Sequence, residues 1–581
     1  MPVTVRVLVN EDDALLYWRI PAPISGCRGF AIERRITQSG RNTSVDEFLP
    51  NRIGFENEPL PPDPQGHGFA KPSTEWPFQL FSWTDHDTNT GDKVQYRVIP
   101  VIRNSAGKLE PLAAEASAWS EPRILGVSEG ATFQPFFNRG FVISQFIARY
   151  LKEHNLSAKE FKNNLTDETE KTIRDFLSGD LRKAMLEQLR LAAEQGGEVF
   201  AALYELSDPE LIAGLTTLGK RAHVVLSNGS ITPRQGETIA DARARDENQK
   251  ARKTLRDAKV DVEFHNRFIS PGALGHNKFL VRTDRDGNPV IAWTGSTNWT
   301  PTGLCTQVNN GLLIQDAEIA QIYLDQWRRL RAAKSEFPDD LVKSNSTPKP
   351  VGQDVPGQIR ATVWFSRTKK GVDMTALTNA VESARQGVLF LMFTPGAAGL
   401  FATVARLSGR ADLYVRGVVS ELPNGRNDES AVDVNLIDGT RQIPSHLDIV
   451  QPEGVKHGMA RFAGDIAELS HRDFVQQVGF AIIHSKVAVI DPFSDDPIVI
   501  TGSHNFSSSA SSKNDENFII VHGDKKLAEA YAVNIIGAYA HYRYRAFLAE
   551  TDKPFNGLKD TDAWQAPKLA ASKQQLDFFG L

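Results

Sequence analysis

The first 125 or so residues alternate between apolar and polar positions in short runs. A period of two is typical of half-buried strands. The runs are Val3–Asn10, Ala14–Ile20, Gly29–Arg35 and Val94–Val101. Turn-rich segments separate them, and the longest, Ser39–Trp76, is rich in Pro, Gly and Asn. The pattern therefore predicts an all-β module with one loop insertion.

Beyond Leu125 the pattern changes to helices and apolar strands, and it occurs twice. The first copy predicts a helix, a strand, a helix and a strand over Lys183–Glu194, Val199–Tyr204, Pro209–Leu218 and Ala222–Leu226. The second copy predicts the same order over Met374–Gln386, Val388–Phe393, Ala398–Leu407 and Leu413–Val419. Apolar strands between helices indicate a sheet that is covered on both faces.

Each copy closes with a long predicted helix, Ala317–Ala333 in the first and Lys526–Leu548 in the second. The repeat of roughly 190 to 210 residues is too long for a solenoid. We expect a multidomain chain in five parts. They are an N-terminal all-β sandwich (1–124), a first α/β half (125–344), a linker rich in Ser, Pro and Gly (345–357), a second α/β half (358–550) and a tail that packs on the body (551–581).

The composition is that of an ordinary globular chain. Of 581 residues, 41% are hydrophobic and 24% are charged, and the net charge of −5 disfavours a surface devoted to nucleic acid. No apolar run reaches roughly 18 residues, and no basic-then-apolar leader opens the chain. The two cysteines, Cys27 and Cys305, exclude a disulfide framework, and Cys305 is expected to be a buried filler. We expect a cytoplasmic protein without a transmembrane segment; a specialised export machine would leave no mark here.

Two segments carry one chemical pattern. The first is His276-Asn277-Lys278 followed by Gly295-Ser296-Thr297-Asn298-Trp299-Thr300, and the second is His484-Ser485-Lys486 followed by Gly502-Ser503-His504-Asn505-Phe506-Ser507. The interval from His to Asn is 22 residues in one and 21 in the other. A lone H-x-K is common, but two copies with a GSxN segment at matched distance are not a chance event.

These two cassettes resemble the phospholipase D superfamily, and the resemblance covers about residues 125 to 550. It implies a duplicated α/β fold with mixed sheets flanked by helices, in which each half gives a His, a Lys and an Asn to one shared active site. The catalytic residues would be His276, Lys278, Asn298, His484, Lys486 and Asn505. Ser296 and Ser503 of the GSxN segments are expected to support them.

The residue types agree with that chemistry. On a strand, positions i and i+2 point to one face, so each His projects with its Lys. Two imidazoles, two ammonium groups and two amides form a receptor for a tetrahedral anion. One histidine would attack a phosphodiester phosphorus and form a phosphohistidine, and the other would protonate the leaving alkoxide. Lysines and asparagines would bind the non-bridging oxygens. We expect no metal and no other cofactor, because fixed cations do this work and no H-E-x-x-H or Cys/His spacing occurs.

The cassettes differ at two places. Glu516 follows the second GSxN segment where Asn309 follows the first. The resemblance implies that this carboxylate orients the histidine of the opposite half, which favours His276 as nucleophile and His484 as acid, although a swap of roles stays open. The family's aspartate after the lysine is matched by Asp491. In the first copy Thr283 stands there and Asp284 comes one residue later.

Other polar residues receive weaker assignments. His504 lies inside the second GSxN segment and is the best candidate among the remaining histidines for a substrate contact. His265, His446, His457 and His471 lack a cassette and are expected to be surface or core residues. Seven basic residues precede the first cassette and alternate with acidic ones, which favours a solvated charged helix over a phosphate-binding face. They are Arg243, Arg245, Lys250, Arg252, Lys253, Arg256 and Lys259.

The N-terminal module resembles a fibronectin type III domain. The resemblance rests on the Leu15–Trp18 strand, on Tyr96-Arg97-Val98 and on Ala118-Trp119-Ser120-Glu121-Pro122, with Tyr96 as the corner tyrosine. A spacer or platform role is expected for such a domain.

Three functions remain open from the sequence. The favoured one is a phospholipase D-like hydrolase or transphosphatidylase acting on phospholipids, with peripheral membrane contact, because bacterial lipid-acting relatives commonly carry both cassettes in one chain. The alternative is a metal-independent nuclease acting on DNA or RNA. A non-catalytic binding protein on the same scaffold is disfavoured by the intact His and Lys pairs. Because one chain holds both cassettes, the active site needs no oligomer.

Overall fold

The computed structural model describes residues 2–58, 69–126, 130–140, 154–157, 160–161, 164–166, 171–262, 266–396, 398–420, 447–450, 483–550 and 557–581, with the backbone alone at 447–450 and 544–550. Four histidines named above, His265, His446, His457 and His471, lie outside these residues. Within the described part of the chain, no helix is both long enough and apolar enough to cross a membrane.

The N-terminal module consists of two antiparallel sheets. One sheet has the order β1 (Thr4–Val9), β2 (Ala14–Arg19), β7 (Ser82–Asp85). The other has the order β10 (Arg123–Ile124), β8 (Lys93–Arg103), β3 (Cys27–Thr37), β4 (Val45–Phe48), with β9 (Leu109–Pro111) also on β8. A small pair, β5 (Pro50–Asn51) and β6 (Lys71–Pro72), lies in the predicted insertion. All four predicted strands are therefore present.

The two sheets of the module share one apolar core. The ring of Trp18 on β2 meets that of Phe30 on β3 edge-on, with 5.8 Å between ring centroids. Tyr96 on β8 is fully buried, and its hydroxyl donates to Oδ2 of Asp85 over 2.8 Å. A corner tyrosine holds a backbone group instead, so Tyr96 differs from that role. The likeness to fibronectin type III domains stays a prediction.

Two larger mixed sheets follow, and their common strand order shows the duplication. The first sheet has the order β11 (Phe133–Phe137), β16 (Asn310–Ile314), β15 (Pro289–Gly295), β14 (Lys278–Thr283), β12 (Val199–Leu203), β13 (Ala222–Leu226). The second has the order β17 (Lys349–Val351), β18 (Arg360–Ser366), β24 (Glu516–His522), β23 (Ile498–Gly502), β22 (Val487–Ile490), β19 (Gly387–Met392), β20 (Tyr414–Val419), β21 (Leu447–Val450). From β11 and from β18 onward, four antiparallel pairings are followed by a parallel one, and the second sheet has a further parallel pairing between β20 and β21.

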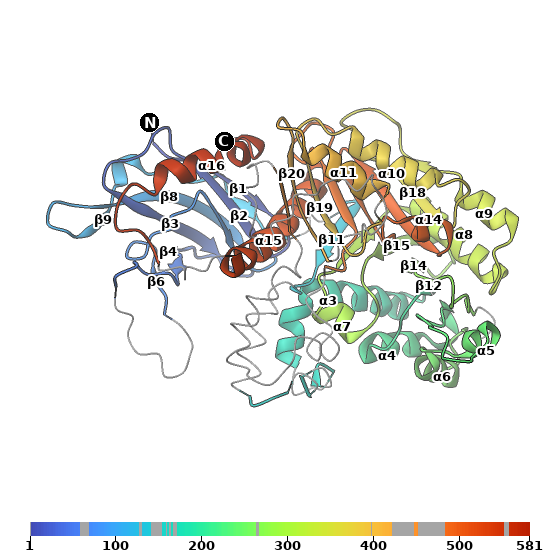
Figure 1. Ribbon diagram of the computed structural model, residues 1–581. Coiled ribbons are helices and arrows are strands. Elements are labelled where there is room, and N and C mark those ends of the chain that lie inside the picture. Colours follow the sequence, from blue (N-terminus) through green and yellow to red (C-terminus); the bar gives the residue numbers. More distant parts are fainter. Residues whose placement is uncertain are drawn as a thin grey trace.

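Helices cover both faces of these sheets (Figure 1). Those of the first half are α3 (Lys171–Gln195), α4 (Pro209–Leu218), α5 (Ile239–Ala244), α6 (Gln249–Asp257), α7 (Pro301–Cys305), α8 (Ala317–Ala333) and α9 (Asp339–Asn345). Those of the second half are α10 (Val372–Glu382), α11 (Leu400–Ser408), α14 (Ser508–Ser512) and α15 (Lys525–Glu550), and α16 (Gln565–Phe578) follows them. The helix predicted over 209–218 has matching bounds because Asp208 caps its first turn by accepting from the N–H groups of Glu210 and Leu211.

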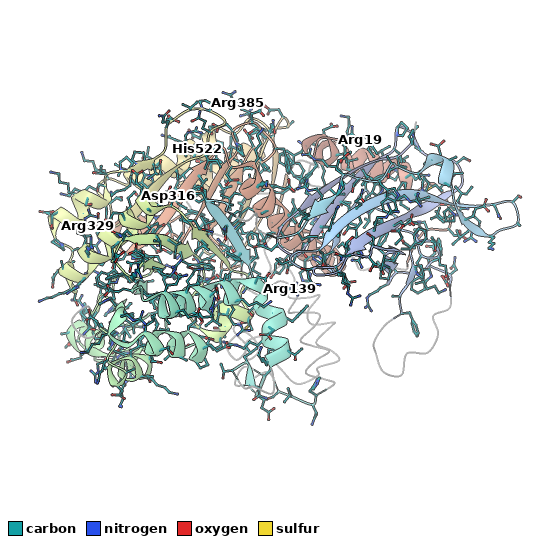
Figure 2. The ribbon with its side chains drawn as sticks, turned by 180° about the vertical axis from the view of Figure 1, so that it is seen from behind. Arg19, Arg139, Asp316, Arg329, Arg385 and His522 are labelled. Atoms are coloured by element: carbon teal, nitrogen blue, oxygen red, sulfur yellow. The ribbon has the colours of Figure 1, made fainter. Side chains whose placement is uncertain are left out.

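Helix α15 joins the three parts of the molecule. It packs on β1 and β2 of the module, on β11 of the first sheet and on β19 and β20 of the second, and Figure 1 shows it between the module and the second sheet. The module is also tied to the first half by an ion pair between Arg139 and Asp12, whose Nε–Oδ2 distance is 2.8 Å. Arg139 is labelled at this junction in Figure 2.

The segments predicted as linker and tail both take part in the fold. Residues 349–351 of the linker form β17, which pairs with β18 and so extends the second sheet. In the tail, the ring of Phe579 stacks on Tyr17 of the module at 4.0 Å, and that of Phe578 stacks on Tyr414 of β20 at 4.5 Å. The C-terminal helix therefore bridges the module and the second half.

Candidate active site

Each H-x-K segment pairs with the segment that follows the GSxN turn of the opposite half. Gly275 forms a parallel bridge with Asp515, and Ile483 forms one with Val308. His276 donates its backbone N–H to the carbonyl of Asp515 over 2.9 Å. These symmetric contacts bring both cassettes together between the two sheets.

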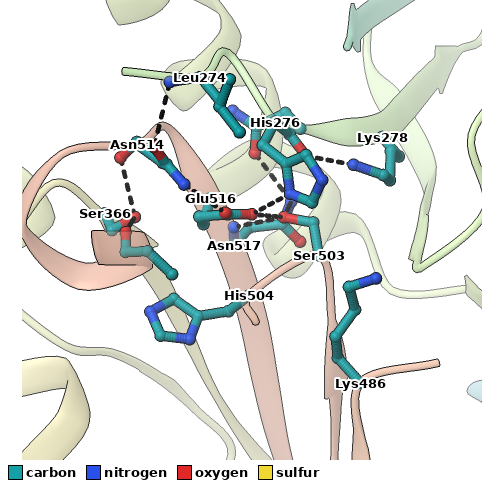
Figure 3. A network of polar contacts seen from close by, with 12 residues as sticks. Leu274, His276, Lys278, Ser366, Lys486, Ser503, His504, Asn514, Glu516 and Asn517 are labelled. Carbon is teal, nitrogen blue, oxygen red and sulfur yellow. Dashed lines mark hydrogen bonds and ion pairs between the residues drawn. The ribbon is translucent and has the colours of Figure 1, made fainter. Parts of the chain in front are cut away.

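His276 is held by a carboxylate of the second half. Its Nδ1 lies 2.8 Å from Oε2 of Glu516, and both side chains are almost fully buried. The same Oε2 accepts from the Ser503 hydroxyl over 2.8 Å, and Oε1 accepts from the Asn514 amide over 3.2 Å. Figure 3 shows this network around Glu516. Because an ionised carboxylate only accepts hydrogen bonds, Nδ1 carries the proton and Nε2 is left with a free lone pair.

His484 is held by a neutral amide of the first half. Its Nδ1 lies 2.9 Å from Oδ1 of Asn309, which also accepts from the Ser296 hydroxyl over 2.7 Å. The Asn309 amide nitrogen donates to the carbonyl of Gly303 over 2.8 Å, which fixes the orientation of the amide. The two histidines thus have matched surroundings and one difference, a carboxylate against an amide.

The two lysines are also in matched positions. Lys278 Nζ donates to the backbone carbonyl of His276 over 2.7 Å, and Lys486 Nζ donates to that of His484. Each ammonium group lies 4.9 Å from the centre of an aromatic ring, Tyr204 for Lys278 and Phe393 for Lys486. Both lysines are at most 1% exposed. Two buried cations with few acceptors favour the entry of an anion.

Burial shifts the protonation of the whole group. It lowers the pKa of His276 to about 4, although Glu516 acts in the opposite direction. It lowers the pKa of Lys278 to about 7, against the effect of Glu516 and Glu205. For His484 and Lys486, burial together with the neighbouring lysines brings the pKa well below its ordinary value. Burial alone would raise the pKa of Glu516, but His276 outweighs it and the pKa falls.

The two GSxN asparagines differ in their contacts. Asn298 Nδ2 donates to Oε2 of Glu205 over 2.8 Å. The Oδ1 atoms of Asn298 and Asn505 are both buried without a hydrogen-bond partner in the described part of the chain. A buried orphan acceptor is costly, so both amides are poised for a bound group.

The glycine of each GSxN segment permits a close approach of two strands. Gly295 has φ +143°, and a Cβ there would lie 2.4 Å from the carbonyl oxygen of Asn310. Gly502 has φ +156°, and a Cβ there would lie 2.3 Å from that of Asn517. The following serine then reaches the residue that holds the histidine, because Ser296 contacts Asn309 and Ser503 contacts Glu516.

The family's aspartate position is structural in both halves. Asp491 accepts from the backbone N–H groups of Gln386 and Gly387 over 2.7 and 2.9 Å. Thr283 plays the corresponding part and accepts from the N–H of Glu198 over 3.0 Å. Asp284, expected as a supporting residue, instead closes an exposed turn with Asn288. Thr283, and not Asp284, therefore occupies the position that corresponds to Asp491, and Asp284 lies outside the site.

His504 does not face the site. It is fully buried, its Nδ1 accepts from the N–H of Phe506 over 3.0 Å, and its Nε2 lies 3.4 Å from Asp373 on α10. Figure 3 shows its ring pointing away from Lys278 and Lys486. The ring packs into the outer layer of the second half, so His504 is a core residue and not a substrate contact.

Three of the basic residues before the first cassette form ion pairs with nearby carboxylates. Arg252 is buried against Asp246 at 2.7 Å, Arg245 binds Glu237 at 2.8 Å, and Lys253 on α6 binds Asp257 at 2.6 Å. This agrees with a charged helix surface more than with a phosphate-binding face.

Both cysteines are buried, and for Cys305 this was expected. Among the described residues, no group of three or more His, Cys, Asp or Glu side chains could hold a metal ion.

Several residues around the site were not singled out in the sequence. Asn310 donates to Thr501 over 2.7 Å, and Asn517 donates to Asn277 over 2.8 Å, so the residue after each histidine holder locks the two halves together. Tyr204 and Phe393, beside the lysines, and Glu205, beside Asn298, were also not singled out. The sequence did contain a signal for them, because the predicted strands 199–204 and 388–393 both end in an aromatic residue and the first is followed by a carboxylate.

Two segments of the chain, residues 181–331 and 426–536, match the family described as "Cardiolipin synthase, PLD-like domain". One matching segment lies in each half of the chain, so the likeness to a phospholipase D-like domain extends over both halves. No curated protein matches the chain.

The solved structures that are similar to the chain include the following three. Phosphatidylserine synthase from Haemophilus influenzae Rd KW20 is 12% identical, covers 70% of this chain and 94% of its own, and gives a TM-score of 0.37. Nuc, a phospholipase D family member from Salmonella typhimurium, is 18% identical, covers 34% and 99%, and gives 0.19. Yeast tyrosyl-DNA phosphodiesterase is 12% identical, covers 58% and 86%, and gives 0.29.

Proposed function

We propose that this protein is a phosphodiesterase of the phospholipase D type that acts through a covalent phosphohistidine. The observation that carries the proposal is the pairing of each catalytic histidine with a holder from the other half, His276 with Glu516 and His484 with Asn309. One buried cluster of side chains then contains two imidazoles and two ammonium groups, which suits a tetrahedral anion.

In the first step, Nε2 of His276 attacks phosphorus and forms a P–N bond while the bond to the leaving oxygen breaks. Glu516 accepts the hydrogen bond from Nδ1–H and stabilises the positive charge that develops on the imidazole. His484, as imidazolium, gives its Nε2 proton to the leaving oxygen. Because the amide of Asn309 stabilises an imidazolium less than a carboxylate does, His484 is the stronger acid, and the negative charge of the substrate favours its protonated form.

In the second step, the neutral His484 takes a proton from water or from an acceptor alcohol. The resulting oxygen nucleophile attacks phosphorus, the P–N bond breaks, and His276 is restored. Lys278, Lys486, Asn298 and Asn505 bind the non-bridging oxygens in both transition states.

A phospholipid is the favoured substrate. The description of the matching family names cardiolipin synthase, and cardiolipin is a phospholipid. Three of the seven basic residues that would favour a nucleic acid, Arg245, Arg252 and Lys253, are engaged with neighbouring carboxylates. Whether water or an alcohol accepts the phosphatidyl group depends on the second step and is decided by the products.

The test compares substrates in the presence of a chelator. The purified protein is incubated with phosphatidylcholine or phosphatidylglycerol vesicles, with and without glycerol, and in parallel with single- and double-stranded DNA and RNA. Release or exchange of the lipid head group by the wild type supports the proposal if His276→Ala abolishes it. The matched control, His522→Ala at the outer end of β24, should retain the activity. Cleaved nucleic acid with unchanged vesicles would replace the phospholipid by a nuclease substrate.

A further inference from the structure

Glu205 is the one carboxylate that reaches the first-half lysine and asparagine from the first half itself, among the residues that the structure describes. It directly follows Tyr204 at the end of β12, and it is partly buried. In the second half, Thr394 follows Phe393 at the corresponding position. The two halves are therefore asymmetric at this point as well as at Glu516.

We propose that Glu205 is a positioning residue of this site. Its carboxylate fixes the amide of Asn298 and supplies the counter-charge that keeps Lys278 an ammonium group. This inference rests on the proposed function and adds to it a residue outside both cassettes.

The geometry at Asn298 supports the first role. An asparagine amide nitrogen has two hydrogens, and one of them is taken by Oε2 of Glu205 over 2.8 Å. The amide cannot rotate without losing this charge-assisted bond. Its second N–H and the orphan Oδ1, both on a side chain that is 5% exposed, are thereby held for a bound group.

The charges around Lys278 support the second role. Lys278 is buried, and its partner across the sheet is Leu203, which stands two residues before Glu205. The carboxylates of Glu516 and Glu205 raise its pKa, and His276 and Lys486 are nearby. Among the described residues, Glu516 alone is a carboxylate that raises the pKa of Lys486, which falls well below its ordinary value, whereas that of Lys278 falls to about 7. Glu205 itself faces Lys278, Asn298 and Glu247; burial and Glu247 raise its pKa, and Lys278 and Asn298 favour the ionised form.

Two substitutions separate the two roles. Glu205→Gln keeps an acceptor oxygen for Asn298 and removes the charge, whereas Glu205→Leu removes both. Exposed Glu194→Gln on α3 is the matched control. Turnover of bis(p-nitrophenyl) phosphate is measured from about pH 5.5 to about pH 9, and a fall of kcat/KM at high pH reports loss of the Lys278 proton.

For Glu205→Gln we expect kcat/KM near that of the wild type at about pH 6 and an alkaline limb that moves about one pH unit lower. For Glu205→Leu we expect the same move and a further loss of about 10–100-fold at every pH, mainly in kcat. An unmoved alkaline limb in Glu205→Gln would overturn the counter-charge. Equal rates for the two variants at about pH 6 would overturn the positioning of Asn298.

A binding measurement keeps this test separate from the proposed function. Binding of sulfate, a tetrahedral dianion that keeps its charge in this range, is measured for the wild type and for Glu205→Gln at about pH 6 and about pH 8. We expect weaker binding by the variant at the higher pH alone. If the wild type turns over no diester, the proposed function fails, and this binding result still decides the inference. Equal binding by both proteins at both pH values would overturn it.

Discussion

His276 and His484 differ in the group that holds Nδ1, and this difference predicts different dependence on the leaving group. His276→Ala should remove at least about 10³-fold of kcat/KM for every diester, because the nucleophile is lost. His484→Ala should cost a similar factor for an alkyl leaving group but far less for p-nitrophenol, which needs little protonation to leave. The rates of first turnover for the two substrates measure this. The reverse ranking of the two variants would assign the roles the other way.

The burial of Lys278 lowers the stability of the fold, because a buried ammonium group loses its hydration. Its pKa is about 7 in the fold and 10.5 ordinarily, so the unfolded chain holds a proton that the folded chain lacks between these pH values. Stability therefore rises with pH over this window, and the cost is fully present below about pH 7.

Lys278→Met should remove this cost. We expect its free energy of unfolding near pH 7 to exceed that of the wild type by about 1–4 kcal/mol, and the gain to shrink toward pH 10, while turnover is lost. Urea unfolding at several pH values measures it, with exposed Lys183→Met as the control. A destabilised variant, or a gain that does not depend on pH, would contradict the account.

At the scale of elements, the GSxN turn is defined by a close contact between strands. Gly295→Ala would place a methyl group 2.4 Å from the carbonyl oxygen of Asn310. We expect a loss of about 2 kcal/mol or more in the free energy of unfolding. Gly409→Ala, whose added Cβ would have its nearest neighbour at 3.4 Å, should be close to neutral. Urea unfolding of both variants tests the contact, and equal stabilities would contradict it.

The elements also show what could be predicted from the sequence. The helix over 209–218 and the strand over 222–226 were predicted with their observed bounds, because caps and apolar runs are local signals. The strands β11 and β18 were missed, since a short apolar run has no clear periodic signature. His276 and Glu516 could be paired only through the resemblance, as they are 240 residues apart.

Residues outside the motifs were harder to predict. Glu205 was missed because its contact with Asn298 spans 93 residues and belongs to no pattern. The position of His504 inside a motif says nothing about which face of the turn its ring takes, so its place in the core is seen in the structure alone. Asp284 was misassigned because the strand register, which places Thr283 inward, is set by pairing with β12.

At the scale of the whole molecule, the C-terminal helix holds the N-terminal module against the second half. Phe579 is fully buried and contacts Tyr17 of the module, Tyr414 of β20 and Phe493. Phe579→Ala should lower the free energy of unfolding by about 3–5 kcal/mol. It should also expose the junction to limited proteolysis.

Ile124→Ala is the control, because this side chain is 65% exposed at the edge of the module, and it should change stability by less than about 0.5 kcal/mol. Equilibrium unfolding and protease digestion of both variants test the bridge. Wild-type stability in Phe579→Ala would show that the module is held by other contacts.

The central claim is that two halves of one chain build a single site in which His276 is the nucleophile. Its most direct test is to trap the intermediate. His484→Ala is mixed with bis(p-nitrophenyl) phosphate, quenched in alkali, which preserves phosphohistidine, and digested for mass spectrometry. The account predicts a phosphoryl adduct on the peptide that contains His276, accumulating because water is no longer activated. An adduct on His484 in the wild type, or turnover without any adduct, would contradict it.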